Sequence, residues 1–426
     1  MKINSEIKVI EGGITSPKGY SASSCAAEIK YKNREDMALV YCEEPAVSAG
    51  VYTSNVVKAA PVLWDKKITD SDEKVRAMVF NSGIANACTG EKGMEICRKT
   101  GEALASYCGT NDKAENILVA STGVIGMQIP VDKITAGVKV LFDNKSDSLE
   151  AGTKASKAIM TTDTINKEVA VSFVIDGKEV KMGGMSKGAG MIHPNMCTML
   201  SVVTTDINIE KSLMQKALSE VVKDTFNMIS VDGDTSTNDT LVLLSNGLAG
   251  NEMITKEDDS YTLFKENLYY ICEYLAKKMA GDGEGATALF EAQVVNASSE
   301  EDAKLMARAV VSSSLSKAAI FGHDANFGRF LCAMGYSGAQ FDQNDVELFF
   351  KSEAGELEVF KKGVPLEFDE EYATKILSCD KVTIFIDMHE GDKEATAWGC
   401  DLSYDSYVFC RVFCSSSFFS CISSCD

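Results

Sequence analysis

The chain has 426 residues, of which 45% are hydrophobic and 24% are charged, which is enough for two or three domain-sized units with a packed core. Its 42 Lys and Arg stand against 62 Asp and Glu, and a net charge of -20 repels phosphate backbones and anionic membrane surfaces. We therefore expect neither nucleic acid nor a membrane as a partner. The N-terminus MKINSEIKVIEGG lacks an apolar stretch of signal-peptide length, and no run approaches the roughly 18 apolar residues of a membrane helix, so we expect a cytoplasmic protein.

Strands and helices are expected in both halves of the chain. The stretches MALVYCEEPAVSAGVY (37–52) and RAMVFNSGIANA (76–87) have the apolar runs of strands in a mixed sheet. Residues 169–185 alternate apolar and polar positions around Asp176-Gly177, a dipeptide that predicts a β-hairpin. Helical spacing of apolar residues predicts helices over 211–229, 266–280 and 301–321. The periodicity supports a mixed α/β class.

The histidines and cysteines do not indicate a metal site. The three histidines, His193, His323 and His389, have no ligand spacing. Fourteen cysteines in a chain of this length without a signal peptide do not suggest a disulfide framework. Four of them lie in a Cys- and Ser-rich ending whose spacing, Cys-x3-Cys-x6-Cys-x3-Cys, is not a usual zinc pattern. Neither GxGxxG after a strand nor GxxxxGK[ST] is present, so neither a dinucleotide fold nor a P-loop is predicted.

The most unusual segment is GGMSKGAGMIHPNMCTMLSVVTTD (183–206), in which glycines precede a strand-like run that begins at Thr198. One interpretation is a tight turn into a buried strand. The other is a bend sharp enough to present the Cys197-Thr198 peptide bond to the hydroxyl of Thr198. A cut there would free an α-amino group, which has a pKa of about 8 and can act as the base for that hydroxyl. One cleavage would thus create both base and nucleophile.

Acyl chemistry also needs hydrogen-bond donors aimed at the developing oxyanion. In NILVASTGVIGMQIP (116–130) an apolar strand ends at Ser121, and Thr122 and Gly123 follow it with a hydroxyl and a backbone N–H. These two groups are candidate oxyanion donors. A plain strand-to-loop turn is the alternative interpretation.

Three further segments each allow either a structural or a ligand-binding interpretation. The threonines of AIMTTDTINK (158–167) surround Asp163 as a helix N-cap cluster or as a binding loop. Asp282 and Glu284 in GDGEGATALF could bind the ammonium group of an amino acid or form a solvated turn. Lys187 could bind a substrate carboxylate or lie on the surface.

Nine segments, in order from about Gly12 to Tyr407, resemble the ornithine acetyltransferase (glutamate N-acetyltransferase) family of self-cleaving bifunctional arginine biosynthesis proteins. The most specific is the cleavage-site block KGAGMIHPNMCTML. The others are SAGVYTSNVVKAAPV, NSGIANACTGEKG, STGVIG, MTTDT, ISVDGDTSTND, DGEGAT, GHDANFGRFLCAMGYSG and AWGCDLSYD.

The resemblance implies an N-terminal-nucleophile-type α/β fold, with mixed sheets sandwiched by helices and a smaller second lobe. It implies self-cleavage between Cys197 and Thr198 into an α chain (1–197) and a β chain (198–426), which stay associated, as an α2β2 heterotetramer. Thr198 would take the acetyl group from N-acetylornithine, release ornithine, and pass the acetyl group to glutamate in a ping-pong cycle. No cofactor or metal is implied, although some members of the family use acetyl-CoA as a donor.

By match to the family's motifs, Thr122 and Gly123 would stabilise the oxyanion. The residues implied to bind substrate are Lys187, Thr198, Glu284 and one of the pair Thr161 and Thr162. The family usually has alanine in place of Cys197.

The C-terminal end departs from the family, which closes with a segment like INADYRT whose Asn and Thr contact substrate. Here YVFCRVFCSSSFFSCISSCD follows Ser406, and residues 408–426 are atypical and resemble a shifted reading frame. Two alternative functions therefore stay open. One is a self-processing aminopeptidase or amidase with water as the acceptor, and the other is an amino-acid-binding protein disabled by its tail.

Overall fold

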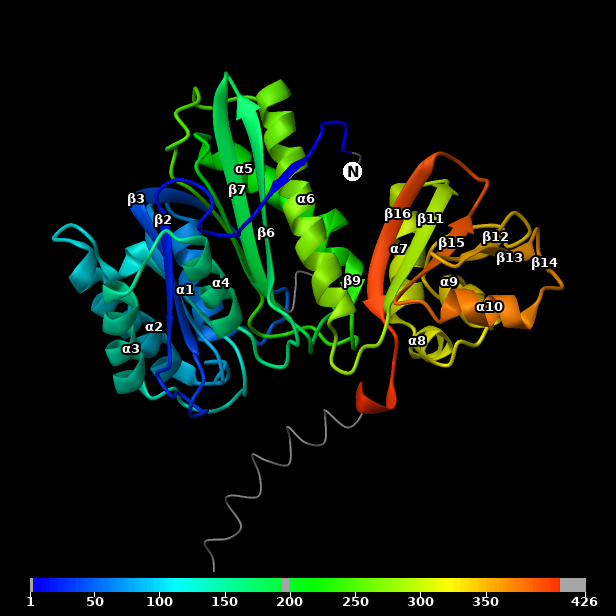
Figure 1. Cartoon of the computed structure of the whole chain (residues 1–426), viewed down its shortest axis with the longest axis horizontal. Coiled ribbons are helices and arrows are strands. Elements are labelled where there is room, and N and C mark those ends of the chain that lie inside the picture. Colours follow the sequence, from blue (N-terminus) through cyan, green and yellow to red (C-terminus); the bar gives the residue numbers. More distant parts are fainter. Residues whose placement is uncertain (1–2, 194–198, 407–426) are drawn as a thin grey trace, which may run out of the picture. The chain divides into compact units, whose positions relative to one another are not determined.

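The computed structural model describes residues 3–193 and 199–406, which form two compact units (Figure 1). Unit 1 comprises the described parts of Met1–Asn227 and Asp234–Met279. Unit 2 is the smaller and comprises Met228–Gly233 and the described part of Ala280–Asp426. Cys197 and Thr198 lie outside the described residues, as does the Cys- and Ser-rich tail.

Unit 1 is built on a mixed sheet with nine strands among the described residues. Its strand order is β1 (Lys8–Ile10), β6 (Lys167–Ile175), β7 (Lys178–Lys187), β8 (Leu200–Thr205), β10 (Thr240–Ser245), β3 (Met37–Tyr52), β4 (Val75–Asn81) and β5 (Ile117–Ser121), with β2 (Tyr20–Cys25) paired to β3. The pairs β8–β10 and β4–β5 are parallel, and the other pairs are antiparallel.

The predicted hairpin between β6 and β7 is confirmed. Ile175 pairs with Lys178, so Asp176 and Gly177 alone form the turn. Their φ angles are +51° and +71°, the pair of positive values that a type I′ turn requires and that Asp-Gly adopts readily. The local sequence therefore sets the register of this hairpin, and with it the position of Lys187 at the end of β7.

Helices pack on the sheet of unit 1, namely α1 (Ala60–Thr69), α2 (Gly90–Cys108), α3 (Val131–Asp143), α4 (Leu149–Ala158), α5 (Lys211–Asp224) and α6 (Asp259–Gly281). Trp64 of α1, Cys97 of α2 and Ala155 of α4 are buried in one apolar cluster with side chains of the strands. On α6, Ile271 and Leu275 lie against Gly184 of β7, where any side chain would collide with them. The helix predicted over 211–229 ends earlier because residues 226–228 form a 3-10 turn.

Unit 2 has a second mixed sheet, with seven strands among the described residues. Its order is β14 (Val364–Pro365), β13 (Gly355–Lys361), β12 (Glu347–Ser352), β15 (Lys381–Asp387), β11 (Leu289–Ala297), β16 (Lys393–Cys400) and β9 (Ile229–Ser230). Its helices are α7 (Glu300–Ser312), α8 (Ser314–Phe321), α9 (Phe327–Gly335) and α10 (Glu370–Leu377). α7 packs on β11 and β16, and α10 packs on β12. The predicted mixed α/β class, with helices on mixed sheets and a smaller second unit, is confirmed.

The single helix predicted over 301–321 is in fact two helices, α7 and α8. Ser313 has φ -69° and ψ 118°, an extended conformation that ends α7. Its hydroxyl oxygen then accepts the Ser316 N–H at 3.2 Å as the N-cap of α8. A serine side chain competes in this way with helical hydrogen bonds, and the apolar periodicity does not register it.

The sheet of unit 1 combines strands from both sides of the Cys197-Thr198 bond. β8 and β10 follow that bond in the chain, and they lie between β7 and β3, which precede it. β8 pairs with β7 from Leu200 to Thr205, and β10 pairs with β3 along its whole length. A cut at this bond would therefore leave the two products joined by two ladders of backbone hydrogen bonds. Over the described ranges, 3–193 and 199–406, no helix is both long and apolar enough to cross a membrane.

Candidate functional site

Lys187 brings together side chains from three separate segments of unit 1. Its ammonium Nζ donates to Thr161 Oγ1 at 2.8 Å and to Thr122 Oγ1 at 3.3 Å, and it lies 3.9 Å from Asp163 Oδ2. Lys187 is only 7% exposed, which excludes the surface reading of this lysine. The structure thus unites a predicted oxyanion donor, Thr122, with two predicted substrate-binding residues. Of the pair Thr161 and Thr162, it is Thr161 whose hydroxyl contacts the lysine.

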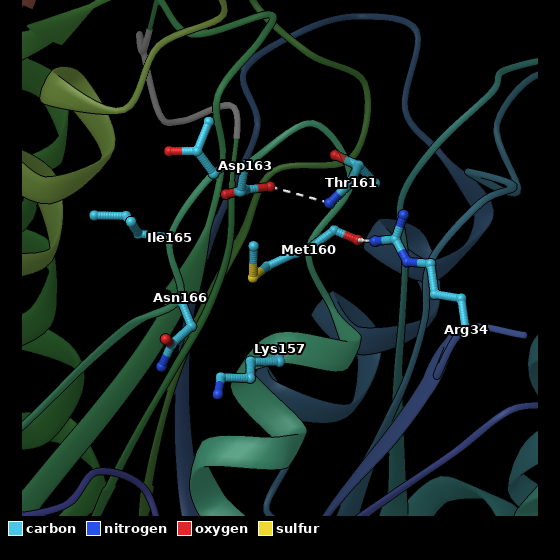
Figure 2. Close-up of a pocket in the computed structure, with 8 residues that line it drawn as sticks. Arg34, Lys157, Met160, Thr161, Asp163, Ile165 and Asn166 are labelled. Atoms are coloured by element: carbon cyan, nitrogen blue, oxygen red, sulfur yellow. Dashed lines mark hydrogen bonds between the residues drawn. The ribbon is translucent and has the colours of Figure 1, made fainter.

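Asp163 is the buried anion that fixes this cluster. Its Oδ1 accepts hydrogen bonds from Lys167 Nζ at 2.7 Å and from the Gly188 N–H at 2.6 Å. Its Oδ2 accepts the Thr161 N–H at 3.0 Å, a bond that Figure 2 shows. Burial by itself raises the pKa of the Asp163 carboxyl. The charges of Lys187 and Lys167, with these hydrogen bonds, outweigh burial and lower the pKa to about 2. The carboxylate is therefore ionised at neutral pH and holds both lysines in place.

Asp163→Asn is expected to lower the free energy of unfolding by about 3 to 5 kcal/mol, because it leaves Lys167 and Lys187 buried beside a neutral amide. Urea unfolding followed by circular dichroism measures the loss. The matched control is Asp143→Asn, which breaks the exposed Lys139–Asp143 pair and should change stability by less than about 0.5 kcal/mol. Equal losses in the two variants would contradict an essential role for Asp163 in the cluster.

Gly123 has a backbone that only glycine fits. Its φ is +128°, and an added Cβ would lie 2.3 Å from the carbonyl carbon of Gly83. The loop is held on both sides of Gly123, since the Thr122 N–H donates to Asn81 O at 3.0 Å and the Val124 N–H donates to Gly83 O at 3.1 Å. The Gly123 N–H itself has no acceptor among the described residues. It is a fixed donor that a ligand can use.

Two asparagines that the sequence did not single out hydrogen-bond to Ser121, at the start of this loop. Asn81 Oδ1 accepts the Ser121 hydroxyl at 2.7 Å, and Asn238 Nδ2 donates to Ser121 O at 2.8 Å. Both asparagines are buried. They belong to the blocks NSGIANACTGEKG and ISVDGDTSTND, but nothing in their local pattern indicates contact with residues 121–123. They position the loop through bonds that span up to 117 positions of sequence.

A pocket of about 470 Å³ opens beside Thr161 and Asp163. Arg34 and Lys157 contribute cationic side chains to its wall, and Figure 2 shows Arg34 directed at the carbonyl oxygen of Met160, to which it donates a hydrogen bond. The sequence reasoning missed both cations. They make this part of an acidic protein suitable for a ligand that carries a carboxylate.

The loop around Glu284 lies in unit 2, where Glu284 is partly exposed and Asp282 is largely buried. Gly285 has φ +75°, and Ser403 Oγ donates to Gly285 O at 2.6 Å. A Cβ on Gly285 would lie 2.5 Å from Ser406 N. The last described residues before the atypical tail are therefore packed against the Glu284 loop.

Comparisons with known proteins agree with the resemblance found in the sequence. The model of the ArgJ family matches residues 21–410. The arginine biosynthesis bifunctional protein ArgJ 1 of Clostridium acetobutylicum is 49% identical over 402 residues, which cover 94% of this chain and 97% of that protein. The ArgJ protein of Caldanaerobacter subterraneus is 47% identical over 399 residues, which cover 94% and 98%. The crystal structure of ArgJ from Bacillus halodurans is 44% identical, with a TM-score of 0.47, and the match covers 50% of this chain and 97% of that one. The chain belongs to the ArgJ family.

Proposed function

We propose that this chain is a self-cleaving acetyltransferase of arginine biosynthesis that moves the acetyl group from N-acetylornithine to glutamate through an ester on Thr198. Its membership of the ArgJ family supports the pathway, because its curated relatives are named arginine biosynthesis bifunctional proteins. The observation that carries the chemistry is the cluster in which Lys187 contacts both Thr122 and Thr161. The next residue, Gly123, has an N–H with no acceptor among the described residues.

Self-cleavage prepares the nucleophile. The Thr198 hydroxyl oxygen bonds to the carbonyl carbon of Cys197, the peptide C–N bond breaks, and the nitrogen of Thr198 takes the proton. Water then hydrolyses the ester, which releases the Cys197 carboxylate and leaves Thr198 with a free hydroxyl and a free amine. Because strands from both products lie side by side in one sheet, the two products are expected to stay associated after the cut.

Acetyl transfer then proceeds in two half-reactions. The Thr198 amine takes the hydroxyl proton, and the oxygen attacks the acetyl carbonyl of N-acetylornithine. The C–N bond breaks, the ornithine amine leaves with the proton, and an acetyl ester remains. The amine of glutamate attacks this ester, which gives N-acetylglutamate and restores the Thr198 hydroxyl.

Thr122 and Gly123 stabilise the oxyanion of each half-reaction in this scheme. The Lys187 ammonium donates a hydrogen bond to Thr122 Oγ1. Because the threonine oxygen is the acceptor in this bond, the hydroxyl proton of Thr122 is available to donate to another acceptor. The Gly123 N–H is fixed and has no acceptor among the described residues. A hydroxyl and an amide donor on consecutive residues form a two-donor oxyanion hole, and such a donor contributes about 100- to 1000-fold in rate.

The substrate carboxylate is assigned to Lys187 and the Thr161 hydroxyl. Thr161 Oγ1 accepts a hydrogen bond from Lys187, so its proton is likewise available to the ligand. Glu284 is assigned to the substrate's ammonium group by its match to the family motif. Acetyl-CoA as a donor and the α2β2 assembly stay predictions.

A tail-disabled protein is a second candidate. The family match ends at residue 410, and the atypical residues begin at residue 408. Ser406, close before them, lies against the Glu284 loop. The two substrate contacts expected from the family's ending are absent from this sequence. This candidate predicts that the chain cuts itself and binds amino acids, but does not transfer the acetyl group.

A product assay distinguishes the candidates. Purified protein is mixed with N-acetylornithine carrying a ¹³C-labelled acetyl group and with glutamate, and the products are separated by mass. Equal amounts of ornithine and labelled N-acetylglutamate are expected. Labelled free acetate without N-acetylglutamate would instead assign an amidase. No turnover in this chain, with turnover restored when the family ending INADYRT replaces residues 408–426, would assign the loss to the tail.

A further inference from the structure

β5 lies at one end of the strand order in the unit 1 sheet, and it leads directly into the loop that holds Thr122 and Gly123. Among the described strands it pairs only with β4. A strand in this position has a row of backbone N–H and C=O groups that no second strand pairs. Here the strand is buried, since Ile117, Val119 and Ser121 are at most 4% exposed. The polar groups on its free edge therefore need other partners.

Two consecutive residues of α1 supply such partners with their side chains. Trp64 Nε1 donates to Ile117 O at 3.0 Å. Asp65 Oδ1 accepts the Val119 N–H at 2.8 Å. Both side chains are buried, and α1 packs on β5. Side chains of a helix thus take the place of a neighbouring strand along this edge.

The same alternation of residues leads to Gly123. Asn238 Nδ2 donates to Ser121 O at 2.8 Å, two positions after the contact made by Asp65. The N–H groups of Thr122 and Val124 point to the opposite side, because both donate to carbonyl oxygens at and just after the end of β4. Successive residues of a strand face alternate edges, so Gly123 belongs to the free edge. The side chains bond this edge as far as Ser121 and leave the Gly123 N–H open to a ligand.

Asp65 is a wholly buried carboxyl that no step of the proposed mechanism uses. Its Oδ2 has no hydrogen-bond partner among the described residues. Burial raises the pKa of the carboxyl well above its usual range, against the hydrogen bond from Val119. A neutral acid still accepts a hydrogen bond from an N–H group. The contact with β5 is therefore the interaction that accounts for a carboxyl at this position.

We propose that Trp64 and Asp65 are positioning residues for acetyl transfer, which hold β5 by its free edge so that the Gly123 N–H stays directed at the oxyanion. The inference rests on the proposed function in one respect, that this N–H stabilises the oxyanion. Both side chains act through the strand and not through contact with the substrate. A donor must lie within hydrogen-bond distance of the oxyanion, and a misplacement of about 1 Å can cost about 100-fold in rate.

Two substitutions of Asp65 separate the acceptor oxygen from the shape of the side chain. Asp65→Asn keeps an oxygen that can accept the Val119 N–H. Asp65→Leu has a similar shape but leaves that N–H buried without an acceptor. The matched control is Asp206→Leu, because Asp206 is also buried and accepts the Lys181 N–H at 2.8 Å and the Lys18 N–H at 3.1 Å. Asp206 follows β8, and three strands lie between β8 and β5 in the sheet.

The values of kcat and KM for N-acetylornithine are measured from the release of ornithine, with thermal unfolding as the check on folding. Asp65→Leu should lower kcat about 10- to 100-fold and leave KM within about threefold, because the oxyanion forms only as the acetyl carbonyl reacts. Asp65→Asn should keep kcat within about threefold, and Asp206→Leu should keep the unaltered kcat despite a lower Tm. Equal kcat values in Asp65→Leu and Asp206→Leu would overturn the proposal. So would an equal loss in Asp65→Asn and Asp65→Leu, since the acceptor oxygen would then not be the cause.

Trp64→Phe decides the question if Asp65→Leu gives no folded protein. This substitution keeps an aromatic ring in the core but removes the donor to Ile117 O. It should lower kcat about threefold or more without a change in KM. An unchanged kcat in Trp64→Phe would overturn the proposal.

Amide hydrogen exchange tests the inference separately from the proposed function. Relative to the rest of unit 1, the amides of residues 117–123 should exchange faster in Asp65→Leu than in Asp206→Leu. Equal exchange in the two variants would overturn the inference even if acetyl transfer is confirmed. If the unaltered chain transfers no acetyl group even with the family ending in place, the proposed function fails, and with it the positioning role of both residues.

Discussion

Thr198→Ala is expected to leave the chain uncut and to abolish acetyl transfer. Alanine has no hydroxyl to attack the Cys197 carbonyl, and without the cut there is no free amine to serve as base. Removing a nucleophile of this kind lowers the rate by more than about 10⁴-fold. Intact-mass spectrometry should show one chain, where the unaltered protein gives fragments that end at Cys197 and begin at Thr198.

Two control variants assign this loss to the hydroxyl. Thr198→Ser keeps the hydroxyl and should still cut, although its rate can change because serine lacks the methyl group that restricts the threonine rotamer. Cys197→Ala places the family's usual residue before the bond and should cut like the unaltered chain, because the Cys197 thiol takes no part in the proposed mechanism. Fragments from Thr198→Ala, or loss of cutting in Cys197→Ala, would contradict the assignment.

Local sequence patterns correctly predicted those elements whose geometry depends on residues close together in the chain. The Asp176-Gly177 hairpin is such a case, because a type I′ turn depends on the two central residues. The apolar run of residues 37–52 likewise became β3 with the predicted bounds. The break at Ser313 was missed, since a single extended residue barely disturbs an apolar period of 3.6.

The contacts of the site could not be predicted in the same way, because they join distant segments. The resemblance named Thr122, Thr161 and Lys187, but only the tertiary structure shows that the Lys187 ammonium group contacts both threonine hydroxyls. The threonines around Asp163 are consistent with a helix N-cap cluster, so the sequence alone left that interpretation of Asp163 open. Lys167, four positions away, is one of its ionic partners. The other is Lys187, 24 positions away, which no local pattern links to Asp163.

The relation of the cut to the fold also needed tertiary information. Composition shows no boundary near residue 197, and the compact units divide elsewhere, around residues 228–233 and 280. The two products instead share one sheet, with β8 and β10 between β7 and β3. Because strands from both sides of the predicted cut pair with one another, the bond between Cys197 and Thr198 can be cut without loss of the fold.

Gly123→Ala is expected to lower acetyl transfer by about 100- to 1000-fold, the loss typical of a displaced oxyanion donor. At φ +128° the new Cβ would lie 2.3 Å from the Gly83 carbonyl carbon, and backbone atoms cannot give way without moving the loop. Such a shift turns the Gly123 N–H away from the oxyanion. Because the oxyanion forms only as the acetyl carbonyl reacts, kcat should fall while KM for N-acetylornithine changes little.

Gly126→Ala provides the matched control in the same loop. Gly126 also has a positive φ, +85°, but an added Cβ meets no atom within 4 Å. The substitution therefore imposes backbone strain of about 1 to 2 kcal/mol without a collision, and transfer should stay within about threefold of the unaltered rate. If both variants lose activity equally, strain in the loop is sufficient to explain the loss. If only Gly123→Ala loses it, with an unchanged melting transition, the close approach of Gly123 to Gly83 is what aims the N–H at the reacting carbonyl.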